Sequence, residues 1–257
     1  MFTLRQYLLA LLDSRGLTRT LGEIDVCRDE QGRPCFSAGN SAAVFRIRLG
    51  GRIRSLRCYL RPMRHLKELY LHTSPETGVW VDTVLGDWIE GSTLHETVAQ
   101  AAALRDRESL QILVRLFDRL ALALVTDNRA HGDLKPENII VGDDGTLCPI
   151  DFDASYLPAF AGEISPELGT AAYQHPARTA ADFDERIDDY PAALISTALH
   201  ALAEDPTLWD RYGSSDGLLY TPQRIASDPA YRETLALFEK RGMAVQYRIA
   251  QLLTAPT

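Results

Sequence analysis

Hydrophobic and polar residues alternate along much of the N-terminal part of this chain. Phe45 to Leu49 alternates apolar and charged residues, Gly50-Gly51 follows, and Arg52 to Tyr59 alternates again. A period of two indicates strands, and a glycine pair between two such runs indicates a hairpin turn. The pattern predicts strands through residues 23–60 and a further strand over residues 79–85.

Helical spacing of apolar residues marks most of the remaining chain. Leu4, Leu8, Leu11 and Leu12 predict an N-terminal amphipathic helix that packs on the body of the protein or on a partner. A short helix is expected over residues 63–71. Longer helices are expected over the ranges 96–105, 109–126, 188–203 and 229–253. Strands therefore dominate the first part of the chain and helices the second.

A second hairpin is predicted between Ile139-Ile-Val141 and Leu147-Cys-Pro-Ile150, because the Asp-Gly pair within Gly142–Gly145 is a strong turn signal. A two-residue turn centred on Asp144-Gly145 would place Asn138 beside Asp151. An amide and a carboxylate held side by side can bind a hard cation through oxygen.

Polar residues with chemical potential flank this hairpin. They read His131-Gly-Asp133-Leu-Lys135-Pro-Glu-Asn138 before it and Asp151-Phe-Asp153 after it. The segment can supply a proton acceptor, a phosphate-binding cation and two magnesium ligands. Lys135 carries extra weight because the chain has 24 arginines and only three lysines. The alternative is a polar loop that merely precedes a hairpin.

These residues resemble the catalytic loop and metal-binding motif of the eukaryotic-type protein kinases, H-R-D-x-K-x-x-N followed by D-F-G. The resemblance implies an α+β bilobal fold, with an antiparallel N-lobe that carries one helix and a mainly helical C-lobe. It implies that Asp133 accepts a hydroxyl proton and that Lys135 neutralises the transferring phosphoryl group. Asn138 and Asp151 would hold Mg²⁺ against ATP.

The same resemblance divides the chain into an N-lobe over residues 1–86, a hinge over 87–94 and a C-lobe over 95–257. Residues 37–44 correspond to the kinase glycine-rich loop, of which Gly39 is present. The Gly50-Gly51 hairpin places Val44 opposite Arg57, on the same face as Ser55, where the family covers adenine and grips phosphates. Arg57 stands where the family has lysine, and its wider guanidinium is not equivalent to an ammonium group. The alternative is an ordinary solvated strand arginine.

Residues 86–94 resemble the kinase hinge. There Asp87 and Ile89 would offer backbone groups to adenine, and Glu90 or Thr93 would lie near the ribose. The alternative is a plain connection in which Ser92 or Thr93 caps the next helix. In the family a helix glutamate pairs with the strand lysine, and Glu68 or Glu76 could take that place, although a surface charge is at least as good a reading.

Gly169-Thr170-Ala-Ala-Tyr-Gln-His-Pro176 resembles the end of a kinase activation segment, but Ala177-Arg178 replaces the family's glutamate. Family analogy makes Asp188 a buried aspartate that bonds to the catalytic loop; helix capping is the alternative. Gly132 replaces an arginine that usually answers to a phosphorylated segment, so activity without such a switch is expected. Asp153 adds a second carboxylate where the family has glycine. His131 is read as a structural residue.

Composition and charge narrow the class of protein. The net charge of −8 argues against a nucleic-acid binder, and 46% hydrophobic with 24% charged residues is typical of a compact soluble protein. The apolar run Leu8–Leu12 is too short to span a membrane. Four scattered cysteines favour reduced thiols in a cytoplasmic protein.

Taken together, the sequence predicts a Mg²⁺- and ATP-dependent kinase that modifies Ser or Thr hydroxyls of a protein substrate. One alternative is a pseudokinase that binds nucleotide or a partner without catalysis, motivated by Arg57 and the sparse glycine loop. Another is a small-molecule kinase, because such enzymes often lack the glutamate after the activation-segment proline.

Overall fold

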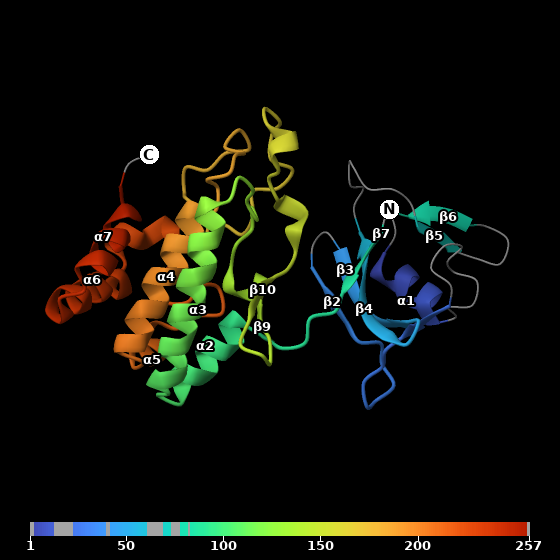
Figure 1. The fold of residues 1–257 in the computed structure, drawn as a ribbon, viewed down its shortest axis with the longest axis horizontal. Helices are drawn as coiled ribbons and strands as arrows, with labels where there is room; N and C mark the ends of the chain where they lie inside the picture. The colour runs from blue at the N-terminus through green and yellow to red at the C-terminus, as the bar shows by residue number, and fades with distance from the viewer. Residues whose placement is uncertain are drawn as a thin grey trace. The chain divides into compact units, whose positions relative to one another are not determined.

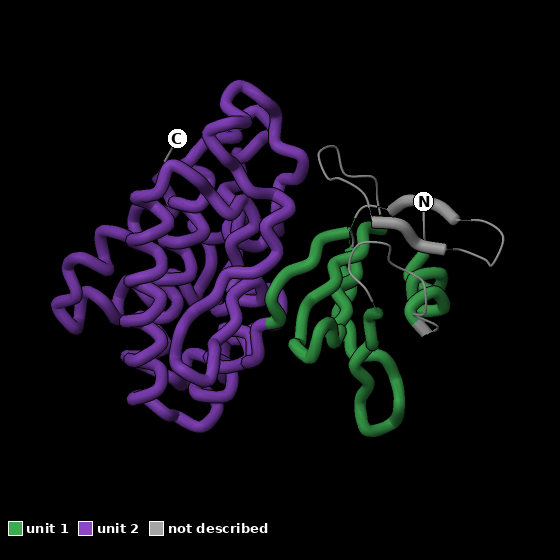
Figure 2. The backbone as a smooth tube through the Cα atoms, turned by 45° about the vertical axis from the view of Figure 1, so that its right-hand side comes forward, with its two compact units in different colours: residues 1–88 green, residues 89–257 purple. Residues whose placement is uncertain are grey.

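The computed structural model describes residues 3–12, 23–39, 42–60, 69–72, 78–81 and 83–255. The chain forms two compact units, Met1–Trp88 and Ile89–Thr257 (Figure 2). Unit 1 is built on an antiparallel sheet and unit 2 is mainly helical, which confirms the predicted α+β organisation. The division between the units falls inside the segment 87–94.

Unit 1 contains a five-stranded antiparallel sheet in the order β1-β3-β4-β7, with β2 paired to β3. Its strands are β1 (Ile24–Val26), β2 (Phe36–Ala38), β3 (Ala42–Leu49), β4 (Arg52–Tyr59) and β7 (Thr83–Asp87). Gly50 and Gly51 both have positive φ, at 55° and 78°, so the predicted two-residue turn joins β3 to β4. Val44 pairs with Arg57, as the alternation predicts.

Helix α1 (Leu4–Leu12) packs against one face of this sheet. Tyr7 and Leu11 join Phe45, Ile47 and other alternating strand residues in a buried cluster. The Tyr7 hydroxyl donates a 2.7 Å hydrogen bond to the carbonyl of Tyr59. The predicted N-terminal helix therefore packs on the sheet of its own unit.

Unit 2 is organised around two long helices that lie side by side, α3 (Arg107–Thr126) and α4 (Asp189–Glu204) (Figure 1). Apolar residues at helical spacing, including Leu110, Phe117 and Leu202, fill the space between them with less than 1% exposure each. The remaining helices are α2 (Leu94–Ala103), α5 (Leu208–Tyr212), α6 (Pro229–Arg241) and α7 (Ala244–Leu252).

A small sheet in unit 2 has the order β10-β9-β8, from β8 (Ser92–Thr93), β9 (Ile139–Val141) and β10 (Leu147–Pro149). Its hairpin corrects the predicted register by one residue. Pro149 pairs with Ile139, and the Ile150 N–H donates to the Asn138 carbonyl at 2.8 Å. The loop has three residues, with Gly145 at φ 77°, a geometry that an Asp-Gly pair also allows. Ile150, rather than Asp151, therefore lies opposite Asn138.

Three other segments differ from the sequence predictions. Residues 69–71, at the end of the predicted helix over 63–71, belong instead to strand β5 (Leu69–His72), which pairs with β6 (Gly78–Val81); Glu68 and Glu76 lie outside the described residues. The predicted strand over 79–85 is divided between β6 and β7, which belong to different sheets. The predicted helix over 229–253 is interrupted where Gly242, at φ 69°, ends α6.

The four cysteines all lie within the described ranges as free thiols. Cys58 is fully buried in β4, and burial raises the pKa of its thiol to about 12. Within the described residues, no helix is both long enough and apolar enough to cross a lipid bilayer.

We expect Cys58 to resist alkylation by iodoacetamide at about pH 9, where an unfolded thiol is substantially ionised. Because its pKa is higher in the native state, the stability that the protonated thiol contributes is complete below about pH 9 and is lost as the pH rises toward about 12. Mass spectrometry of the labelled peptides measures how much of each cysteine is alkylated. The partly exposed Cys148 is the control, and equal labelling of the two would contradict the expectation.

Candidate active site

A buried carboxylate holds the loop from His131 to Asn138 in place. Asp188 immediately precedes α4 and is 1% exposed. It accepts hydrogen bonds from the backbone N–H groups of His131 and, at 3.0 Å, of Gly132. Burial raises the pKa of Asp188, whereas the backbone N–H groups of His131 and Gly132 and the Arg178 guanidinium act in the opposite direction. The prediction that Asp188 bonds to the loop backbone is confirmed.

His131 fastens the loop to Ile150, the residue directly after β10. Its Nε2 lies 2.8 Å from the carbonyl oxygen of Ile150, and its Nδ1 accepts the Asp133 N–H at 3.3 Å. A neutral ring with its proton on Nε2 satisfies both bonds. The Phe152 ring lies against it, with 4.9 Å between centroids. Both ring nitrogens are engaged, which supports a structural role for His131.

Gly132 occupies a position that admits no side chain. Its φ is 80°, and a Cβ atom there would lie 2.0 Å from the carbonyl oxygen of Ala154. Its own carbonyl accepts a 2.9 Å hydrogen bond from Arg178 Nη1. The absence of the family's arginine at this position thus has a steric reason as well as a regulatory interpretation.

Asp133 lies at the centre of a polar cluster. Its Oδ1 accepts the Thr170 N–H at 2.5 Å, and its Oδ2 accepts Asn138 Nδ2 at 3.1 Å. Lys135 Nζ lies 3.3 Å from Oδ2 and donates to Thr170 Oγ1 at 2.7 Å. The side chains of Asp133 and Lys135 are 17% and 23% exposed, so both can reach a ligand. The cluster holds an oriented carboxylate and a cation a few ångströms apart.

The segment that carries Thr170 approaches the loop closely because Gly169 precedes it. Gly169 has φ 71°, and a Cβ atom there would come within 2.7 Å of the Gly132 carbonyl oxygen and 3.0 Å of Asp133 Oδ1. A larger residue would push Thr170 away from Asp133. The Gly-Thr pair seen in the sequence is therefore part of the site.

Asn138 and Asp151 are the predicted metal ligands. Asn138 is 6% exposed, and its Nδ2 also donates to the Asp133 carbonyl at 2.9 Å, which leaves its amide oxygen to face a cation. Asp151 follows Ile150 in a left-handed conformation, φ 70° and ψ 64°. Such a conformation in a residue other than glycine is strained, and strain of this kind gathers at functional sites.

Magnesium at this site would depend on its substrate for ligands. In the described part of the chain, no three His, Cys, Asp or Glu side chains gather as a metal cluster. Mg²⁺ is usually held by one or two protein oxygens together with phosphate oxygens and waters. The donor set of Asn138 and Asp151 fits that mode of binding and not a closed protein cage.

The predicted nucleotide residues of unit 1 share the sheet face opposite α1. Val44, Ser55 and Arg57 alternate with the buried strand residues, and Arg57 lies over the Tyr59 ring, 5.6 Å from its centroid. Ser55 Oγ donates to the Asp87 carbonyl at 3.1 Å, and the Asp87 carboxylate pairs with the guanidinium of Arg54. One of the backbone groups predicted to meet adenine already has an internal partner.

Gly39 adjoins β2, and its N–H donates to the Ala42 carbonyl at 2.9 Å. A Cβ atom on Gly39 would meet no described atom within 4 Å. The backbone around Gly39 therefore imposes no steric need for glycine. Its predicted phosphate contact stays a prediction.

The other predicted nucleotide residues open unit 2. Ile89 is 37% exposed. Thr93 caps α2: its Oγ1 accepts the Glu96 N–H at 3.2 Å, and the Glu96 carboxylate accepts the Thr93 N–H at 2.9 Å. This is a capping box, so the capping alternative describes Thr93. Gly91 allows the close approach to β9, since a Cβ there would lie 2.1 Å from the Val141 carbonyl oxygen.

Sequence comparisons give the site a context. The chain is 29% identical over 161 residues to CBL-interacting protein kinase 17 of Oryza sativa subsp. japonica, a match covering 60% of this chain and 35% of the relative. It is 34% identical over 113 residues to serine/threonine-protein kinase PknL of Mycobacterium tuberculosis, covering 42% and 27%. It is 25% identical over 164 residues to serine/threonine-protein kinase chk1 of Schizosaccharomyces pombe, covering 62% and 32%.

The chain is a distant homologue of the serine/threonine protein kinases. No protein-family model matches its sequence. The matched region spans about a third of the length of these curated relatives. Membership is therefore at the level of the superfamily.

Sequence reasoning assigned no role in the site to two residues of this kinase homologue. Thr170 binds both Asp133 and Lys135, and the Gly-Thr motif was a usable signal for it. Arg178 binds the Gly132 carbonyl and the Gln174 side chain. Its only sequence signal was its place beside the missing glutamate, which says nothing about where its side chain goes.

We expect Gly132→Ala to destabilise this kinase homologue by several kcal/mol, because an unfavourable φ is combined with a clash against backbone. Gly145→Ala is the matched control. Gly145 has a similar φ of 77° but no described atom within 4 Å of its Cβ position, so only the conformational cost of about 1 kcal/mol should appear. Urea unfolding measures both, and equal losses would show that the close approach to Ala154 is not a constraint.

Proposed function

We propose that this chain is a Mg²⁺- and ATP-dependent phosphotransferase that acts on a hydroxyl group, most plainly Ser or Thr of a protein. The observation that carries the proposal is the cluster of Asp133, Lys135, Asn138 and Thr170. Phosphoryl transfer needs positioning and charge stabilisation more than covalent chemistry, and this cluster supplies both.

Each member of the cluster has a distinct role in this proposal. Asp133 is oriented by two donors, and its carboxylate accepts the proton of the attacking hydroxyl. Lys135 spans Asp133 and Thr170 and neutralises negative charge on the transferring phosphoryl group. Asn138 and Asp151 hold Mg²⁺, which when bound supplies positive charge to the ATP phosphates.

Unit 1 contributes the nucleotide-covering face in this proposal, through Gly39, Val44, Ser55 and Arg57. At the hinge, Asp87 and Ile89 offer backbone groups to adenine in this proposal, and Thr93 lies near the ribose. A protein that uses cellular ATP and keeps four free thiols fits a reducing compartment such as the cytoplasm.

A pseudokinase is the second candidate, and one observation favours it. Arg57 replaces the family lysine and lies over Tyr59, 5.6 Å from the ring centroid. An arginine engaged along its own strand would grip phosphates less well than a lysine aimed at them. Nucleotide binding without transfer would then be the activity that remains.

We expect wild-type protein to transfer label from γ-³²P-ATP with Mg²⁺ to Ser/Thr peptides or to itself. Asp133→Asn should reduce the rate about 10²- to 10⁴-fold, because the proton acceptor is lost while the shape is kept. Asp127→Asn is the control: Asp127 lies four residues before the loop and pairs with Arg129 at the surface, so transfer should persist.

Other outcomes separate the alternatives. A thermal shift with ATP and Mg²⁺ but no transfer would identify a pseudokinase. Transfer to metabolites but not to peptides would identify a small-molecule kinase. Absence of any thermal shift and of any transfer would contradict every nucleotide-based reading.

A further inference from the structure

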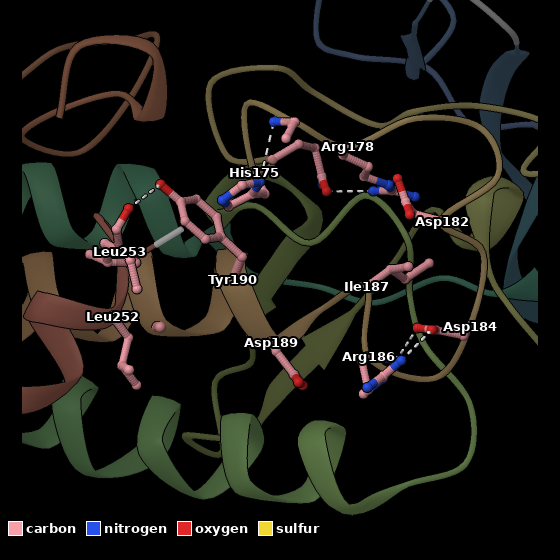
Figure 3. A pocket seen from close by; sticks show the side chains of 14 residues that line it. His175, Arg178, Asp182, Asp184, Arg186, Ile187, Asp189, Tyr190, Leu252 and Leu253 are labelled. Carbon is pink, nitrogen blue, oxygen red and sulfur yellow. Dashed lines mark hydrogen bonds and ion pairs between the residues drawn. The ribbon is translucent and has the colours of Figure 1, made fainter. Parts of the chain in front are cut away.

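Arg178 brings a half-buried positive charge close to the candidate active site. It lies after the segment that carries Thr170, where Figure 3 shows it between His175 and Asp182 at the edge of a pocket in unit 2. Its Nη1 donates to the Gly132 carbonyl at 2.9 Å and also bonds Gln174 Oε1. Gln174, 5% exposed, approaches the same carbonyl at 3.5 Å through its Nε2.

The surroundings of this guanidinium are acidic. Asp188, Asp133 and Asp182 all raise the pKa of Arg178, against a larger lowering by burial. Asp133 and Asp188 belong to the same short stretch of structure, since Asp188 binds the Gly132 N–H and Asp133 is the next residue. The positive charge of Arg178 therefore lies near two carboxylates of the candidate site.

The hydrogen bonding of Arg178 is incomplete in a way that bears on its role. Its Nε and Nη2 are buried and have no hydrogen-bond partner among the described residues. Buried donors without partners lower the free energy of unfolding. An arginine that served only to stabilise the fold would therefore be unfavourable at this position. What Arg178 supplies is charge beside two carboxylates and a bond to one loop carbonyl.

We propose that Arg178 is a positioning residue of the phosphoryl-transfer site, tying residues 169–178 to the catalytic loop through its hydrogen bond to the Gly132 carbonyl. This inference rests on the proposed function. It deepens that function by assigning the assembly of the site to an arginine of the same chain, which holds the loop without any phosphorylated residue. Gly132 offers its carbonyl oxygen at the loop, and Arg178 brings the donor and its charge from another segment.

The test compares steady-state kinetics of Arg178→Met, Arg178→Lys and Arg186→Met in the full chain. Arg186 is the matched control, because it lies in the following segment, is 75% exposed and pairs with Asp184 at 3.0 Å. Arg178→Met should lower kcat about 10- to 100-fold, with the KM for ATP changed less than about twofold. Arg178→Lys should recover part of the loss because it restores charge without the planar fork. Arg186→Met should match wild type.

The inference would be overturned if Arg178→Met turned over like wild type, or if Arg178→Lys were no better than Arg178→Met. Should Arg178→Met fail to fold, Arg178→Lys carries the test: a lowered kcat at native thermal stability supports the inference, and wild-type kcat overturns it. Wild-type protein without transfer activity would be a failure of the proposed function instead. In that case amide hydrogen exchange tests whether Arg178 holds the loop. Faster exchange at residues 131–138 in Arg178→Lys than in Arg186→Met supports the inference, and equal exchange overturns it.

Discussion

The candidate active site depends on one buried carboxylate, Asp188, and its two bonds to the backbone of His131 and Gly132. An ionised carboxylate in a protein interior costs several kcal/mol unless donors surround it. Two backbone N–H groups and a nearby guanidinium offset part of that cost here, although burial still raises the pKa of Asp188. Because Asp188 immediately precedes α4, whose residues pack in the main core, its bonds tie the loop to the core of unit 2. The geometry around Asp133 follows from that anchor.

Backbone constraints explain residues that depart from the kinase motif. Gly132 is a departure from the kinase pattern, yet its φ and the carbonyl of Ala154 leave no room for a side chain. A Cβ atom at position 169 would clash with the Gly132 carbonyl oxygen of the same loop, so glycine is required there too. The two glycines allow two segments distant in sequence to touch, and that contact delivers Thr170 to Asp133. The absence of the family's arginine at position 132 and the close contact between the loop and the Thr170 segment therefore belong to the same arrangement.

The sequence predicted most of the fold where a signal was local and repeated. Helical periodicity located α3 and α4, and the Gly50-Gly51 turn gave the correct β3–β4 register because a two-residue loop leaves no freedom. The β9–β10 register was wrong because an Asp-Gly pair fits a two- or a three-residue loop equally well. The helix predicted over 229–253 failed at Gly242, where apolar spacing continues but the backbone turns left-handed.

In the candidate site, too, the residues that are close in sequence were predictable and the contacts between distant segments were not. Asp133, Lys135 and Asn138 are close in sequence, so their spacing alone brings them together. Contacts such as Lys135 to Thr170 and Gly132 to Arg178 join segments some 35 to 46 residues apart. No periodic pattern encodes such pairs, because each depends on how the intervening chain returns to the loop.

The departures from the kinase pattern divide between the two units in a way that bears on mechanism. In unit 2 the groups proposed to act on the reacting atoms are present and mutually bonded. In unit 1 the residues expected to grip nucleotide are altered or engaged locally, as Arg57 is over Tyr59 and Ser55 is with Asp87. Interactions made equally in the ground state and the transition state set KM, whereas those made only in the transition state set kcat. Under the proposed function, altered nucleotide residues beside an intact transfer cluster would give weak ATP affinity with preserved turnover. An inactive scaffold would have no chemical need for the bonded carboxylate and lysine.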